Sequence, residues 1–150
     1  MSYIRIWVHV VFTTKDQIPL LSPKETRNKV FEHIYENAKE KAIRIDCLNG
    51  YKEHVHCLVS LGCDQPISKV AQLIKGESSW WINKNKLITS KFVWQDDYWA
   101  VSLSESHIPA VRNYIKSQEE HHRIKSFTEE VDEFMSKYGW SYISEGTSKK

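Results

Sequence analysis

The strictest constraint in this sequence is the alternation of side chains in YKEHVHCLVSL, residues 51–61. Side chains of a β-strand point to opposite faces in turn, so this run predicts a strand. One face would carry Val55, Cys57, Val59 and Leu61. The other would carry His54, His56, Leu58 and Ser60. Both imidazoles are therefore expected on one face, where they suit two ligands of one metal ion or two partly exposed histidines without a role.

Patterns on both sides of this strand predict the other elements and their order. Strands are expected at Tyr3–Thr14, Ile43–Gly50 and Asp97–Ser104. An Asn-Gly turn would join the second of these to the histidine strand in a hairpin. Helices are expected at Ser22–Ala42, Ile67–Asn85, Ser106–Ile124 and Thr128–Gly139. This order favours an α+β fold, a ferredoxin-like antiparallel sheet with helices packed on it.

The apolar positions of these elements predict which side chains face inward. In the first strand they are Ile4, Ile6, Val8, Val10 and Phe12. In the first two helices they are Val30, Ile34, Ala38, Val70, Leu73 and Ile74.

The helix expected at Ser106–Ile124 carries polar side chains beside a buried stripe. The stripe consists of Ile108, Val111 and Ile115. Tyr114 and Gln118 are four residues apart, so they stand one turn apart on its flank. A tyrosine can act as a nucleophile, and an amide oxygen can bind a hard metal ion. Two strand histidines and one helix oxygen would bind a divalent ion through three ligands and leave positions for substrate oxygens.

Other groupings of the same residue types fit less well. A zinc module would need both histidines together with Cys57 and Cys63. On a regular strand Cys57 faces away from the histidines, so this geometry fails. The tyrosines expected to serve only in packing are Tyr35, Tyr51 and Tyr138.

Composition limits the setting of the protein more than its activity. The 150 residues, 41% hydrophobic and 27% charged, are expected to form one domain over residues 1–150, with a flexible tail at about 140–150. A net charge of +2 does not by itself indicate a nucleic-acid partner. Three cysteines without a CxxC pair favour a reducing, cytoplasmic location. No membrane-spanning run or signal peptide is recognisable, so we expect no membrane partner.

Four segments, in the right order, resemble one family. EHVHCLVSL resembles the HUH motif, in which a bulky hydrophobic residue separates two histidines. VRNYIKSQEEHHRIKSFTEEV resembles the segment with the single catalytic tyrosine. WVHVVFTTKDQIPLL and ISKVAQLIKGESSWWINK resemble the first strand and the DNA-contacting helix. From about Tyr3 to Tyr138, the chain is similar to small single-tyrosine HUH transposases, the insertion-sequence-200-like transposases, which include REP-associated tyrosine transposases.

The resemblance implies a role for each of these polar side chains. His54, His56 and Gln118 would bind Mg²⁺ or Mn²⁺. Tyr114, on a C-terminal helix, would attack a phosphate of single-stranded DNA and form a 5′-phosphotyrosine link with a free 3′-OH. A second 3′-OH would reverse the step, so the strand transfer would need no nucleotide cofactor.

The resemblance also implies partners. They are hairpin-bearing ends of single-stranded DNA and a second copy of the chain, because family members usually work as homodimers in which the tyrosine helix of one subunit can serve the histidines of the other. Basic residues of the helices expected at Ile67–Asn85 and Ser106–Ile124 would provide the phosphate contacts. They are Lys69, Lys75, Lys84, Arg112, Lys116, His121 and Arg123. Solvated basic residues on any helix form a similar pattern.

Two other functions share these motifs. A domesticated protein that binds palindromic DNA would keep the fold and the site but would no longer transpose a mobile DNA element. A replication or conjugation nickase of HUH type would also carry the histidine pair and the tyrosine. Such initiators usually use a third histidine or an acidic ligand and add longer domains, for which this chain has no room.

Overall fold

The structure, a computed structural model, describes residues 2–120, 126, 128–130 and 132–133. Its strands are β1 (Ile6–Thr13), β2 (Arg44–Tyr51), β3 (His54–Leu61) and β4 (Trp99–Leu103). Its helices are α1 (Lys24–Glu40), α2 (Ile67–Lys84) and α3 (Ile108–Lys116), with short 3-10 turns η1 (Lys15–Gln17) and η2 (Glu105–His107). Each strand and α-helix overlaps a segment predicted from the sequence, because alternation and helical spacing persist along whole elements.

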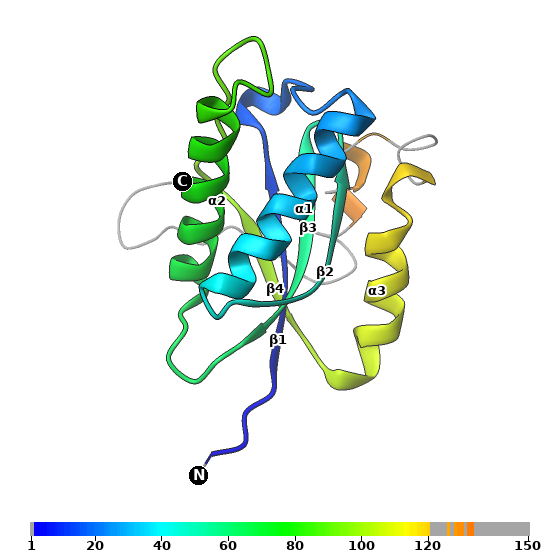
Figure 1. Cartoon of the computed structure of the whole chain (residues 1–150). Helices are drawn as coiled ribbons and strands as arrows, with labels where there is room; N and C mark the ends of the chain where they lie inside the picture. Colours follow the sequence, from blue (N-terminus) through cyan, green and yellow to red (C-terminus); the bar gives the residue numbers. More distant parts are fainter. Residues whose placement is uncertain (1, 121–125, 127, 131, 134–150) are drawn as a thin grey trace, which may run out of the picture.

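The four strands form one antiparallel sheet in the order β2-β3-β1-β4. Figure 1 shows α1 and α2 lying across this sheet, with α3 beyond β2. α1 and α2 pack on one face, whereas α3 packs on the other face, against β2 and β3. Each of α1 and α2 connects two strands that are not neighbours in the sheet. This is the predicted α+β, ferredoxin-like arrangement.

The core beneath α1 and α2 consists largely of the predicted inward residues. From the strands it contains Val8, Val10, Phe12, Val55, Cys57 and Val59. From the helices it contains Val30, Ile34, Ala38, Val70 and Ile74, with Leu73 partly buried against them. Burial of one such side chain stabilises the fold by about 1.5–3 kcal/mol. Ile4 and Ile6 were also predicted inward, but both are exposed, because Ile4 precedes β1 and Ile6 is its first residue.

The predicted Asn-Gly turn of the β2–β3 hairpin is wrong. Asn49 and Gly50 lie inside β2 and pair with β3, and the two-residue turn is formed by Lys52 and Glu53. A Cβ atom at residue 50 would overlap the carbonyl oxygen of His54, so the glycine permits close approach of the two strands. The Asn-Gly pair therefore marks a close backbone contact here, and the strand pattern continues past it.

α3 is shorter than the helix predicted at Ser106–Ile124. It follows η2 and ends at Lys116, where the amide of Ser117 donates to the carbonyls of Asn113 and Tyr114. Residues 118–120, 128–130 and 132–133 are again helical. The rest of the helix predicted at Thr128–Gly139, and the tail at about 140–150, lie outside the described residues.

The setting predicted from composition is tested only in part. None of the described helices is long and apolar enough to cross a membrane. Cys47, Cys57 and Cys63 are free thiols. The single domain over residues 1–150 and the cytoplasmic location stay predictions.

Candidate active site

His54 and His56 lie on the same face of β3, as the alternation predicted. Their neighbours Val55 and Cys57 belong to the core beneath α1 and α2, and Leu58 packs in a second cluster with α3. The histidine side chains therefore face the α3 side of the sheet. Both are fully buried, at 0% exposure, so neither is a partly exposed surface histidine.

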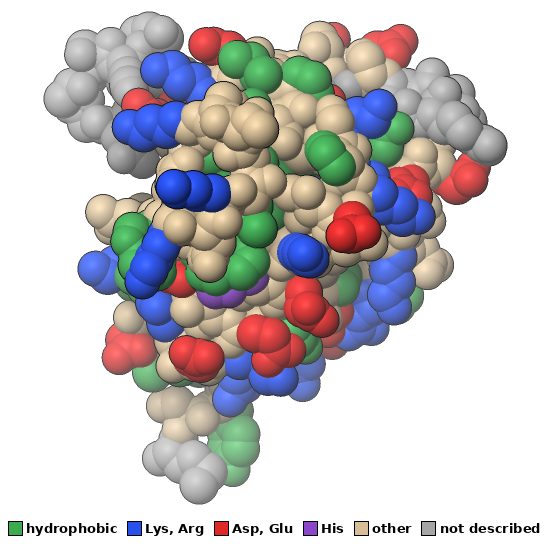
Figure 2. Space-filling model, turned by 45° about the horizontal axis from the view of Figure 1, so that its top comes forward, with side chains coloured by type: hydrophobic (Ala, Val, Ile, Leu, Met, Phe, Trp, Pro, Cys, Tyr) green, Lys and Arg blue, Asp and Glu red, His purple; other side chains and the backbone are tan. Residues whose placement is uncertain are grey.

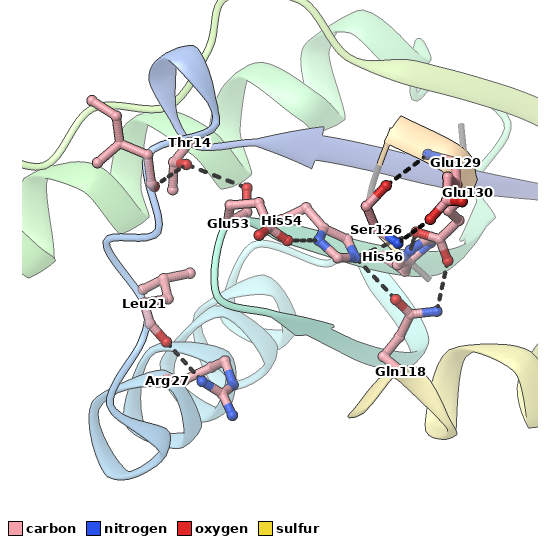
Figure 3. A network of polar contacts seen from close by, with 11 residues as sticks. Thr14, Leu21, Arg27, Glu53, His54, His56, Gln118, Ser126, Glu129 and Glu130 are labelled. Carbon is pink, nitrogen blue, oxygen red and sulfur yellow. Dashed lines mark hydrogen bonds and ion pairs between the residues drawn. The ribbon is translucent and has the colours of Figure 1, made fainter. Parts of the chain in front are cut away.

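Each of these rings is hydrogen-bonded through its Nδ1 atom. His54 Nδ1 lies 2.7 Å from Glu53 Oε1, and His56 Nδ1 lies 2.9 Å from His9 Nε2 on the neighbouring strand β1. Figure 3 shows that Glu53 contacts the His54 ring on the side away from Gln118. Partners of this kind fix the orientation of a ligating imidazole and leave Nε2 for a metal ion.

Gln118 brings its amide oxygen to the same place. Its Oε1 lies 2.9 Å from His54 Nε2, and its side chain is buried at 0% exposure. The amide nitrogen, Nε2, donates weakly to the carbonyl of Tyr114, at 3.4 Å. When His54 Nδ1 carries the proton for Glu53, the Nε2 lone pair faces another lone pair on Gln118. A cation between the two atoms satisfies both.

Glu130 also reaches the site, and the sequence analysis missed it. Its Oε1 lies 3.3 Å from His56 Nε2 and 3.5 Å from His54 Nε2. Its Oε2 accepts a hydrogen bond from Gln118 Nε2 at 3.2 Å (Figure 3). Burial is the main cause that raises the pKa of the Glu130 carboxyl to about 7, and His54 opposes this shift.

One signal in the sequence could have identified Glu130. On a helical wheel it is the acidic residue of this segment closest to the apolar positions Phe127, Val131 and Phe134. Glu129 and Asp132 fall farther from that stripe on the same wheel. A carboxylate at the edge of an apolar stripe is a candidate for burial, and a buried carboxylate needs a partner.

Tyr114 lies against the histidines of the same chain. Its ring centroid is 5.5 Å from that of His56, with the planes at 84°, and 6.4 Å from that of His9. Its hydroxyl oxygen is buried. The predicted stripe of α3 explains this position, because Ile108, Val111 and Ile115 are all buried against Trp7 and Leu58.

The segment that carries Gln118 is also tied to α1. Arg27, only 4% exposed, donates to the carbonyls of Leu21 and Ser22. Its other terminal nitrogen lies 3.2 Å from Glu119 Oε2. The guanidinium therefore links the start of α1 to the residue that follows Gln118 (Figure 3 shows the Leu21 contact).

The basic residues predicted to contact DNA have different surroundings. Lys69, Lys84 and Lys116 are exposed, and Lys84 lies over the ring of Trp80. Lys75 donates to the carbonyl of Asp96, and Arg112 makes two hydrogen bonds to the carboxylate of Asp46. The remaining two, His121 and Arg123, lie outside the described residues. On the face in Figure 2, basic side chains are interspersed with acidic ones.

The donor set fits a divalent cation. His54, His56 and Glu130 each offer one ligand atom, and these atoms lie within 4.8 Å of one another. Donor atoms about 2.1 Å from one ion, at right angles to each other, are about 3 Å apart. The contacts of 2.9, 3.3 and 3.5 Å are close to that spacing. Imidazole and oxygen ligands together suit ions such as Mn²⁺.

Comparisons with known proteins agree with this architecture. The family model described as "Transposase IS200 like" matches residues 2–118. A solved structure of a candidate transposase from Deinococcus radiodurans R1 superposes with a TM-score of 0.62 at 16% identity, over 78% of this chain and 93% of that chain. A REP-associated tyrosine transposase, solved bound to a REP hairpin, superposes with a TM-score of 0.56 at 16% identity, over 79% and 67% of the two chains. No curated protein matches the sequence.

Proposed function

Since this chain belongs to the family of IS200-like transposases, we propose that it cleaves and rejoins single-stranded DNA through Tyr114 with the help of a divalent metal ion. The observation that carries the proposal is the position of Tyr114. Its ring contacts that of His56, and Gln118, one turn further on, contacts His54. A nucleophile and a set of metal ligands thus meet within one chain.

The metal ion would be held by His54 Nε2, His56 Nε2 and Gln118 Oε1, and would be Mg²⁺ or Mn²⁺. When bound, it supplies positive charge that polarises the scissile phosphate and stabilises the charge developing on its oxygens. The protein orients these donors beforehand, because Glu53 and His9 hold the two rings from behind. Burial excludes water from the site and strengthens each electrostatic contact.

In the first step, the oxygen of Tyr114 attacks the phosphorus of the scissile phosphate. The new bond joins that oxygen to phosphorus, and the bond from phosphorus to the 3′ oxygen breaks. The phenol gives up its proton in this step and the leaving 3′ oxygen gains one, so the protons balance. In the second step, a 3′-OH attacks the phosphotyrosine and releases Tyr114, so the number of phosphodiester bonds is kept and no nucleotide cofactor is needed.

The substrate would be single-stranded DNA with hairpins at the ends to be joined. A structurally similar REP-associated transposase was solved bound to a REP hairpin, which supports a hairpin substrate for this chain. Lys69, Lys84 and Lys116 are exposed and suit phosphate contacts. Arg112 is already paired with Asp46, so it is a weaker candidate.

Replacement of Tyr114 by phenylalanine tests the proposal most directly. The ring and its packing remain, whereas the nucleophilic oxygen is lost, and the intermediate is covalent through that oxygen. Tyr114→Phe should bind labelled single-stranded hairpin oligonucleotides from the flanks of the coding sequence as tightly as the unmodified protein. It should give no covalent protein–DNA band on a denaturing gel and no strand-transfer product.

Two other tyrosines provide matched controls. Tyr35 is exposed on α1, and Tyr51 ends β2 beneath the guanidinium of Arg27. Phenylalanine at either position should leave the covalent band intact. A persistent band from Tyr114→Phe would mean that another residue is the nucleophile and that the proposed site is wrong.

A further inference from the structure

We propose that Glu130 is a fourth protein ligand of the metal ion, binding it through Oε1 while Oε2 orients the amide of Gln118. This inference rests on the proposed function, because it adds a residue to the metal site of His54, His56 and Gln118. It makes the site anionic, whereas the other three ligands are neutral.

The position of the Glu130 carboxylate supports direct ligation. Oε1 lies 3.3 Å from His56 Nε2 and 3.5 Å from His54 Nε2. Both nitrogens are the ring atoms left for a metal ion when the Nδ1 atoms are hydrogen-bonded. One ion next to these two nitrogens would therefore lie next to Oε1 as well.

Burial of the carboxylate favours a cation at this place. The Glu130 side chain is only 4% exposed, and both imidazole nitrogens facing it belong to fully buried rings. A carboxylate taken out of water needs a cation, a proton or several hydrogen bonds. A divalent ion beside Oε1 compensates the charge and binds the imidazole lone pairs at the same time.

The second carboxylate oxygen sets the orientation of Gln118. Gln118 Nε2 donates to Glu130 Oε2 at 3.2 Å, which leaves the amide oxygen directed at His54 Nε2, 2.9 Å away (Figure 3). If the amide were turned over, its nitrogen would face His54 and could not bind a metal ion. Glu130 thus contributes both a ligand and the orientation of a neighbouring ligand.

Glu130 is part of the helical residues 128–130, which follow α3 in the chain, whereas the histidines are on β3, one of the two inner strands of the sheet. Metal binding would therefore link this C-terminal segment to the sheet. Four protein ligands leave two positions of an octahedral ion for the phosphate and for the attacking or leaving oxygen. The chain should accordingly bind metal tightly before DNA arrives.

Mn²⁺ binding to the full chain without DNA tests this inference. The free Mn²⁺ signal in electron paramagnetic resonance gives the affinity directly. Glu130→Gln keeps the shape and an amide oxygen but removes the charge, and it should lower Mn²⁺ affinity at least about tenfold. Glu130→Asp keeps the charge but shortens the side chain by one methylene group, and it should give a smaller loss of Mn²⁺ affinity.

The adjacent residue supplies a matched control. Glu129 is exposed, and its carboxylate accepts a hydrogen bond from the amide of Ser126. Glu129→Gln removes the same charge from the same segment and should leave Mn²⁺ affinity unchanged. Thermal midpoints in EDTA show whether the variants are folded, and the Glu130→Asp variant carries the test if Glu130→Gln is not.

The outcomes separate this inference from the proposed function. If His56→Ala loses Mn²⁺ binding while both Glu130 variants bind as the unmodified protein does, Glu130 is not a ligand and the three-residue site stands. If His56→Ala also binds Mn²⁺ normally, the proposed metal site is wrong, and the inference falls with it.

Discussion

The rings of His54 and His56 are oriented by residues that contact their Nδ1 atoms. In the tautomer that leaves Nε2 for a metal ion, His54 Nδ1 donates to Glu53 and His56 Nδ1 donates to His9. His9 can accept because burial, and secondarily His56, lowers its pKa well below the ordinary value. A neutral His9 on β1 therefore matches the requirement of a ligating histidine on β3.

Removal of either ligand ring should separate chemistry from binding. His54→Ala or His56→Ala should lower the cleavage rate by more than about 100-fold, since loss of an outer-shell partner alone costs 10- to 100-fold. Hairpin binding should stay within a few-fold, because phosphate and base contacts are made elsewhere. Cleavage of a labelled hairpin oligonucleotide and a gel-shift assay measure the two effects.

Chelation provides the matching experiment on the unmodified protein. EDTA should stop cleavage, and excess Mg²⁺ or Mn²⁺ should restore it. Full cleavage in EDTA would rule out the metal-dependent mechanism.

Among the elements, α3 determines the position of Tyr114, the proposed nucleophile. Its stripe is buried against Trp7 and Leu58, and this packing leaves Tyr114 beside His56. The turn at Ser117 then starts the helical residues 118–120, with Gln118 directed at His54. The ion pair of Arg27 with Glu119 adds a link from this segment to α1.

Shortening a buried side chain of the α3 stripe should weaken the packing of α3 on the sheet. Ile115 is fully buried, so Ile115→Ala should lower the free energy of unfolding by about 2–5 kcal/mol, through lost burial and the cavity left behind. Asn113→Ala, at an exposed position of the same helix, should change it by less than about 0.5 kcal/mol. Urea unfolding followed by tryptophan fluorescence measures both. Equal effects would mean that the stripe does not hold the helix.

At the scale of the whole molecule, one chain brings together all the described residues of the proposed site. His9 comes from β1, His54 and His56, the proposed metal ligands, from β3, and Tyr114 from α3. The sequence resemblance implied a homodimer in which a tyrosine can serve the histidines of a partner. The homodimer stays a prediction, but the structure has the tyrosine beside the histidines of its own chain.

Mixing two inactive variants tests which chain supplies the tyrosine. Tyr114→Phe and His56→Ala each destroy one part of the site. If each site is built within one chain, a mixture should show no more covalent product than either variant alone, even after subunit exchange is demonstrated with tagged proteins. In an equal mixture half of the dimers would be heterodimers with one intact site of two, so recovery approaching about a quarter of the unmodified activity would show that sites are shared between subunits.

The sequence by itself determined most of the elements and most of their inward side chains. Alternation in β3 placed both histidines on one face, and helical spacing in α3 gave the stripe beside Tyr114 and Gln118. These are local properties, because each depends only on the repeat of one element and on the exclusion of apolar side chains from water. Local patterns also predicted the order of elements, from which the α+β, ferredoxin-like fold class was inferred.

Only the tertiary structure decided which distant groups meet. The Asn-Gly pair predicts a turn by local preference, but pairing of β2 with β3 continues past it to Lys52 and Glu53. Likewise, the contact of His9 with His56 depends on the register of β1 against β3. The contact of Glu130 with His56 depends on the packing of the helical residues 128–130 against the sheet. Strand register and the packing of separate segments are set by the whole fold, so a local pattern can mark Glu130 as a candidate for burial but does not say which distant residues it meets.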